Sequence, residues 1–409
     1  MRHREPRRRR RGFSLVEMMV ALALTIFMMA ILSEAFVVGL ESFRRLKGIA
    51  DLDSNLRTAA NLLRRDLRAN HFEGNLRVSD LFGRTGSTHP DLGFFCVGEG
   101  YNPTTRTPQA SVLEGFDANN LPSFRDTDDF LHMTVRFNGN ERDAFLYGQT
   151  SAANNPLDQI GFPSGRYDNL PNTYANQWGE VVYWLAPAVE PGGQQRWTGG
   201  APGVGLPLFD LHRRALLLVP EFFSAGTAMP PRPGSVAPPN TDDVSAFGSA
   251  PNSPADVQYP QRRFGVQELP SSSNPTGRMF VWNFQPLGGP RQGADRIMTD
   301  VLSFDVKVWN GSIFVDLAGG DGSRFGGLGN NPAVGVRGTD PNAPRNLAVY
   351  DTWCQRNGPN GWNFGNWSLQ ANNPYVPPYP VPLQAIQITI RVWDRKTEQA
   401  RQITIIQDL

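Results

Sequence analysis

The chain opens with an apolar segment that leads into a long amphipathic pattern. Residues 13–33 read FSLVEMMVALALTIFMMAILS, and Glu17 is their only charged side chain. At 1.5 Å per residue, a helix of this length crosses a bilayer core of roughly 30 Å. Further along, apolar residues recur every three or four positions, and no proline occurs between Pro6 and Pro90. We predict one helix from Phe13 to about His71, with a transmembrane part at 13–33 and an amphipathic continuation at 34–72.

Beyond residue 72 the pattern changes to short runs rich in β-branched and aromatic residues, which are typical of strands. The last of them suggest a C-terminal hairpin in 381–409, turning at Asp394–Thr397, with isoleucines alternating toward one buried face. The fold class is therefore α+β: one long N-terminal helix packed on a mainly antiparallel β-sheet head at 73–409. The predicted strands are Phe130–Phe137, Glu180–Leu185, Arg214–Val219, Arg278–Phe284, Val301–Val308, Ser312–Leu317, Leu383–Trp393 and Gln402–Ile406.

Irregular stretches separate these strands. The chain holds 41 glycines and 34 prolines, and they are dense at 186–206, 225–262, 318–344 and 357–382. Loops of this length are functional or inserted segments. Because they interrupt one strand framework, we predict a single head domain with long insertions.

Charge is distributed unevenly along the chain. Overall the net charge is +1, but residues 1–11 hold seven arginines and one acid, while the other 398 residues hold 32 basic and 37 acidic side chains. Basic residues before an apolar helix predict a cytoplasmic N-terminus and a head on the other side of the membrane. A cleaved secretory signal is the alternative, but the long apolar run and the continuing helix favour an anchor. A body of net charge −5 argues against nucleic-acid binding, which needs basic surfaces.

The residues around the start of the apolar segment, RGFSLVE at 11–17, resemble the type IV prepilin processing motif. The resemblance implies that a prepilin peptidase and methyltransferase removes residues 1–12 as a leader, cutting after Gly12 and methylating the new N-terminal Phe13. It also implies an assembly role for Glu17. In apolar surroundings this carboxylate can neutralise the α-amine of a neighbouring subunit's Phe13, because a pair there costs far less than a lone charge.

The order of the strands resembles the J-type minor pseudopilins of type II secretion. Four segments carry this likeness: Tyr183–Leu185, Leu211–Arg213, Val301–Gly311 and Ala385–Ile405. The resemblance implies a structural subunit near the tip of the pseudopilus, anchored by a single pass in the inner membrane, with a periplasmic head that binds other minor and major pseudopilins. The alternative is a W-type minor pilin of a type IV pilus, serving adhesion, motility or DNA uptake.

Enzyme motifs are absent from the sequence, so we expect a protein without catalytic activity, cofactor or metal. None of the five histidines forms HExxH or has a cysteine at zinc-ligand spacing, and no Walker A loop or G-x-S-x-G elbow occurs. Two carboxylate groups, Asp126–Asp128–Asp129 and Asp316 with Asp321, are interpreted as solvated turn residues. Calcium binding is the alternative for either group, although neither has EF-hand spacing.

Cys96 and Cys354 are the only cysteines. A head outside the cytoplasm permits a disulfide between them, and a bridge over so long a loop would stabilise the fold. Two buried thiols are the alternative, because spacing in sequence does not show that the Cα atoms come within reach.

Overall fold

The computed structural model describes residues 14–74, 76–81, 90, 92–99, 125–149, 173–219, 243–247, 250–270, 278–309, 311–316, 348–352 and 383–409. The chain divides into two compact units, Met1–Ser54 and Asn55–Leu409. The first contains most of a long helix, and the second contains the end of that helix with the β-rich head.

The helix α1 runs without interruption from Leu15 to Arg68, 54 residues, which corresponds to about 80 Å. The prediction of a single helix is confirmed, with ends two and three residues inside those expected. Its apolar side chains between Leu15 and Leu46 are exposed. Within the second unit, Leu56, Ala59, Leu63 and Leu67 of the periodic apolar pattern are buried, together with Ala60, whereas Phe43 and Leu46 of the same pattern are exposed.

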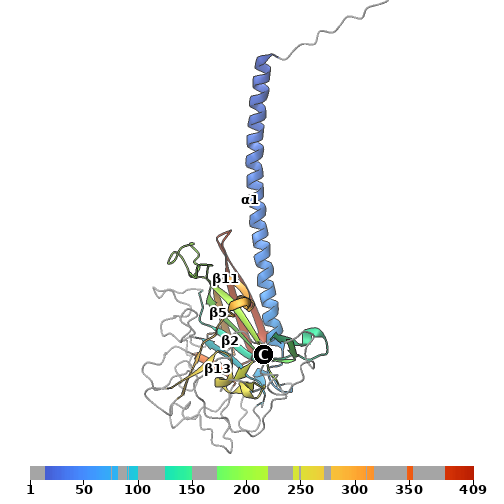
Figure 1. Cartoon of the computed structure of the whole chain (residues 1–409), viewed down its shortest axis with the longest axis vertical. Helices are drawn as coiled ribbons and strands as arrows, with labels where there is room; N and C mark the ends of the chain where they lie inside the picture. Colours follow the sequence, from blue (N-terminus) through green and yellow to red (C-terminus); the bar gives the residue numbers. More distant parts are fainter. Residues whose placement is uncertain are drawn as a thin grey trace, which may run out of the picture. The chain divides into compact units, whose positions relative to one another are not determined.

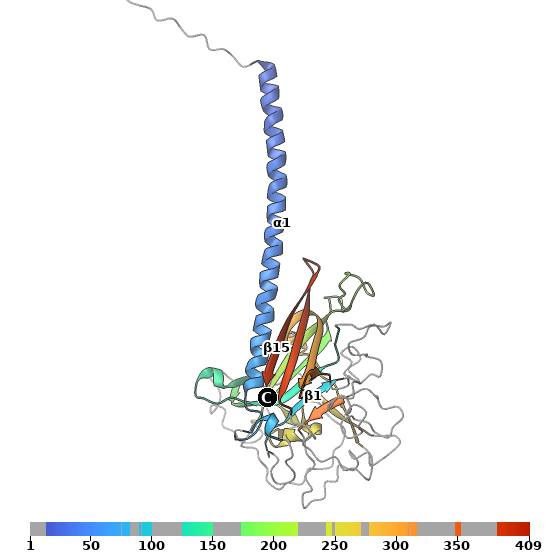
Figure 2. The same cartoon turned by 180° about the vertical axis from the view of Figure 1, so that it is seen from behind.

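The head is built on a nine-stranded sheet in the order β13-β1-β2-β5-β6-β11-β14-β15, with β12 paired to β11. Every pair of neighbouring strands in this sheet is antiparallel. The hairpin of β14 and β15 is drawn in red in Figures 1 and 2. The α+β architecture is confirmed. The bounds are β1 Phe95–Glu99, β2 Phe130–Arg136, β5 Trp178–Pro187, β6 Phe209–Leu217, β11 Arg296–Trp309, β12 Phe314–Val315, β13 Ala348–Asp351, β14 Ala385–Asp394 and β15 Gln399–Asp408.

Smaller elements surround this sheet. Three two-stranded sheets pair β3 (Leu146–Gln149) with β4 (Thr173–Asn176), β7 (Ala246–Phe247) with β8 (Ala250–Pro251), and β9 (Val266–Pro270) with β10 (Arg278–Trp282). Short 3-10 turns occur at Val78–Leu81, Arg142–Ala144, Asp256–Gln258, Pro260–Arg262 and Gly289–Arg291. Part of the region predicted as loop at 225–262 therefore has regular structure.

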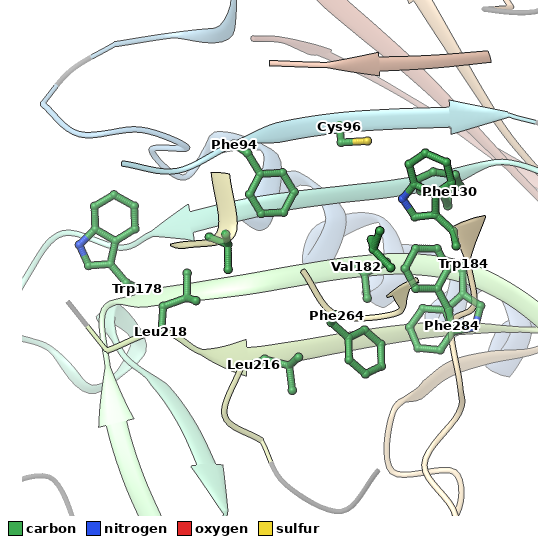
Figure 3. Close-up of a cluster of buried hydrophobic side chains, with 13 residues drawn as sticks. Phe94, Cys96, Phe130, Trp178, Val182, Trp184, Leu216, Leu218, Phe264 and Phe284 are labelled. Carbon is green, nitrogen blue, oxygen red and sulfur yellow. The ribbon is translucent and has the colours of Figure 1, made fainter. Parts of the chain in front are cut away.

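The central strand β5 is buried on both faces, which explains its continuous apolar run. Val182 and Trp184 belong to an aromatic cluster on one face, together with Phe94, Phe130 and Phe284 (Figure 3). The intervening Tyr183 points to the opposite face, where its hydroxyl reaches α1. The sheet thus separates the aromatic cluster from the end of the helix.

Each predicted strand overlaps an observed one, but the bounds differ: the strands predicted for β5, β6, β11 and β15 were too short, and those predicted for β2, β10, β12 and β14 were too long. The strand expected at Arg214–Val219 begins five residues earlier, at Phe209, because its first part alternates charged and apolar residues that pair with β5 and β11. The expected C-terminal hairpin is present, and Ile386, Ile388 and Ile390 of β14 are buried. The sequence analysis missed β1 and β13 of the main sheet, which are four or five residues long. It also missed the short strands β3, β4, β7, β8 and β9.

Candidate functional site

The first turn of α1 is closed by two reciprocal hydrogen bonds. The backbone N–H of Ser14 donates to Oε2 of Glu17 at 3.0 Å, and the backbone N–H of Glu17 donates to Oγ of Ser14 at 3.2 Å. This arrangement is a capping box, in which a serine before the helix and a glutamate three residues later satisfy two orphan donors. The sequence analysis did not predict this capping box, although the spacing Ser-x-x-Glu is the pattern that indicates one. Gly12 and Phe13 lie outside the described residues, so cleavage and methylation there stay predictions.

One described helix, α1, is long and apolar enough to cross a membrane. Its first basic side chains, Arg44, Arg45 and Lys47, follow the apolar segment, and Arg45 pairs with Glu41 at 2.8 Å. An apolar surface of this extent is typical of a helix that is covered by lipid or by other helices.

The end of α1 carries a buried carboxylate, which the sequence reading did not single out. Asp66 is fully buried and receives three hydrogen bonds from two neighbouring strands. Arg213 of β6 donates from Nε to Oδ2 at 2.7 Å and from Nη2 to Oδ1 at 3.1 Å, and the Tyr183 hydroxyl of β5 donates to Oδ2 at 2.5 Å. Burial lowers the pKa of Arg213, but the nearby Asp66 and Tyr183 outweigh it and raise this pKa above its usual value. Burial and Asp66 raise the pKa of Tyr183, so its hydroxyl remains a donor.

Just after the helix, His71 joins α1 to β2. Its Nδ1 lies 2.7 Å from the carbonyl oxygen of Thr134, and its Nε2 lies 3.3 Å from that of Leu67 in the last turn of α1. The Thr134 hydroxyl donates to the His71 carbonyl at 2.5 Å and accepts from the backbone N–H of Phe94 at 2.9 Å. Burial lowers the pKa of His71.

A second buried network contains serine, glutamate and histidine, but not in the order that catalysis needs. Glu180 accepts from His132 Nε2 at 2.8 Å, from the Phe264 backbone N–H at 2.7 Å and from the Ser245 hydroxyl. The carboxylate therefore stands between the serine and the histidine, whereas a nucleophilic serine needs the histidine as its direct base. All three side chains are buried, so the group connects strands within the core.

The carboxylates Asp126, Asp128 and Asp129 are buried, which corrects their interpretation as solvated turn residues. Their oxygens lie within 4.8 Å of one another, and the same holds for Asp126 with Asp305 and Asp316. The segment runs beside β11, where the backbone N–H of Phe304 donates to the Asp126 carbonyl at 2.9 Å. Periodicity did not show this, because the contact joins residues far apart in sequence.

The lysine of β11 lies beside these acids. Lys307 Nζ pairs with Asp316 and lies 3.5 Å from Asp305. Burial raises the pKa of Asp305 to about 6, opposed by Lys307 and assisted by Asp316. Asp321, the other acid of the predicted pair, lies outside the described residues.

Cys96 lies in β1 and is buried in the aromatic cluster shown in Figure 3. Burial raises the pKa of its thiol well above the usual value, with a further contribution from Asp351. Cys354 lies outside the described residues, so the bridge between the two cysteines stays a prediction.

The prepilin motif at the start of α1 and the α+β head together indicate a type IV pilin-like or pseudopilin protein, anchored by its apolar helix. Residues 7–33 match the family model of the prokaryotic N-terminal methylation motif. This match includes Gly12, Phe13 and Glu17, and proteins with this motif are typically structural subunits. No curated protein matches the chain, and no solved structure matches it.

Proposed function

We propose that this protein is a minor pseudopilin, a structural subunit near the tip of a type II secretion pseudopilus that contributes to protein export through assembly. The observation that carries the proposal is the methylation motif at 7–33, whose second part forms the apolar start of one continuous helix, in a chain with a β-rich head. Prepilin processing would release the leader, and the exposed apolar part of α1 would then pack among the helices of other subunits.

The four segments that carry the resemblance to J-type minor pseudopilins lie in neighbouring strands of the sheet. Tyr183–Leu185 lies in β5, Leu211–Arg213 lies in β6, and the other two segments comprise most of β11, β14 and β15. These strands are consecutive in the order β5-β6-β11-β14-β15. The likeness therefore covers one contiguous block of the head, and the additional strands β2, β1 and β13 extend the sheet on one side of it.

Mass spectrometry of the protein purified from its own host tests the processing step. We expect the mature chain to begin at a methylated Phe13, and we expect Gly12→Val to accumulate the uncut precursor. A mature chain that retains Met1, or a cut after another residue, would contradict the proposal.

The substitution Glu17→Gln distinguishes the two roles proposed for Glu17, which are closing the capping box and pairing with the Phe13 amine of a neighbouring subunit. Glu17→Gln keeps the capping box, because glutamine closes it as well as glutamate does, but it removes the charge that would pair with a neighbour's Phe13 amine. We expect normal processing with loss of the protein from purified filaments. Glu34→Gln changes an exposed glutamate in the same helix and is the matched control, which we expect to assemble.

The secretion and pilus roles are distinguished by deleting the gene and restoring it. We expect the deletion strain to retain type II substrates inside the cell, while surface pili and twitching remain. Loss of pili with normal secretion would instead favour the W-type minor pilin.

A further inference from the structure

The Asp66 triad, defined as Asp66, Tyr183 and Arg213, interrupts the apolar stripe by which α1 contacts the head. Asp66 lies three positions after Leu63 and seven after Ala59, so it shares their face of the helix. An aliphatic residue at position 66 would continue the apolar stripe, and no charge would have to be removed from water. A carboxylate is tolerated only because both of its oxygens are hydrogen-bonded.

The two donors are held in place by the sheet itself. Tyr183 and Arg213 are direct cross-strand partners of β5 and β6, and Arg213 Nε also lies 3.1 Å from the Tyr183 hydroxyl. Since β5 and β6 lie inside the sheet, with β2 and β11 on their outer sides, the donors cannot follow a moving helix. The bidentate contact between the guanidinium and the carboxylate adds a strict angular requirement.

The other contacts of this part of the helix are far less selective. Leucine and alanine side chains pack without directional bonds, so the stripe tolerates small slides and rotations. A shift by one residue turns the helix by about 100° and moves it by about 1.5 Å. Such a shift would separate the buried Asp66 carboxylate from both of its donors and remove its three hydrogen bonds, which is unfavourable for a buried charge.

We propose that the Asp66 triad is a register lock: it fixes the rotation and height of the end of α1 on the sheet. Buried ionic groups are often poor contributors to stability and are best attested as devices that select one register. The lock is a property of the single chain. Its use in assembly, where a fixed rotation would turn one face of the head toward a given neighbour, rests on the proposed function.

Cysteine cross-linking of the full-length chain in detergent measures the register. Arg68 Nε lies 3.2 Å from Gln407 Oε1, and Arg65 Nη2 lies 2.7 Å from the Asp143 carbonyl. Arg68→Cys with Gln407→Cys therefore reports on the contact with β15, and Arg65→Cys with Asp143→Cys reports on the contact with the turn at Arg142–Ala144. A short bis-maleimide should link both pairs efficiently in the otherwise unchanged chain, and single-cysteine variants give the background from the native thiols.

The deciding variant replaces the triad by apolar residues of similar size: Asp66→Leu, Tyr183→Phe and Arg213→Met. We expect it to remain folded by circular dichroism, while cross-linking of both pairs falls by about threefold as the helix populates neighbouring registers. The matched control removes another ion pair of the head, Arg263 with Asp351, as Arg263→Met and Asp351→Leu. We expect this control to keep both cross-links.

Unchanged cross-linking in a folded apolar variant would overturn the lock and leave the triad a local contact. If the apolar variant does not fold, Asp66→Asn in the folded chain decides the question, since it keeps the volume and removes the charge. Retention of both cross-links at full yield in that variant would also overturn the lock. Neither measurement involves secretion or pilus assembly, so failure of the lock and failure of the proposed function are distinguishable.

Discussion

Two glutamates of the head differ enough in surroundings to test how the core is held together. Glu180 on β5 is 1% exposed and accepts from Phe264, His132 and Ser245. Glu190, after the same strand, forms a surface ion pair with Arg395 at 2.8 Å. Replacing each with alanine removes one carboxylate in either case, but only the first substitution leaves buried donors without an acceptor.

The expected loss for Glu180→Ala follows from those donors. Each buried donor left unsatisfied costs about 1–3 kcal/mol, and water entering the new cavity restores part of the loss. We therefore expect the free energy of unfolding to fall by about 3–5 kcal/mol. Glu180→Gln keeps an oxygen for Phe264 and His132 but turns an amide toward Ser245, so we expect a fall of about 1–2 kcal/mol.

Urea unfolding of the detergent-solubilised chain measures these differences in the free energy of unfolding. The transition is monitored by tryptophan fluorescence and by circular dichroism. Trp184 belongs to the same buried cluster as Phe264 and so reports on this region. Coincident transitions by the two probes are needed before midpoints are converted to free energies. We expect no resolvable change for Glu190→Ala. A Glu180→Ala midpoint as high as that control would refute the argument that the network holds the core together.

Three further results are expected. Burial lowers the pKa of His71 and of His132. Below about pH 6.5 these histidines are therefore protonated in the unfolded chain but remain neutral in the folded chain. The free energy of unfolding should fall toward pH 5 by up to about 1.4 kcal/mol per pH unit for each histidine. A flat profile of urea midpoints between pH 7.5 and 5.5 would contradict this. Gly93→Ala should destabilise the head by about 2–4 kcal/mol, because Gly93 has φ +90° and a Cβ would overlap the His71 carbonyl oxygen; Gly192→Ala, with open space around its Cβ, should unfold like the parent chain. Thermal unfolding should be the same in EGTA and in about 1 mM calcium, since Lys307 already supplies a cation beside Asp305 and Asp316; a calcium-dependent rise in melting temperature would favour the alternative of a calcium site.

The sequence predicted those elements whose pattern of apolar and polar residues repeats over a short stretch of the chain. The helix could be predicted because its apolar residues recur every three or four positions and no proline interrupts it. The hairpin of β14 and β15 could be predicted because alternating isoleucines define one buried face of β14. The prepilin motif is likewise read from consecutive residues, and its match at 7–33 needs no tertiary structure. The short strands β1 and β13 could not be predicted, since strands of four or five residues carry little pattern of their own.

The sequence by itself thus predicted the long apolar helix and the α+β fold class, and it carries the methylation motif at 7–33. Only the tertiary structure decided which polar residues meet. Asp66 is separated from Tyr183 by 117 positions and from Arg213 by 147, and Glu180 meets Phe264 across 84. Such contacts depend on the order and register of the strands, which place Tyr183 beside Arg213 under the end of the helix. A shift of β5 by one residue would turn Glu180 and Tyr183 to the opposite faces of the sheet, because side chains alternate at every residue of a strand.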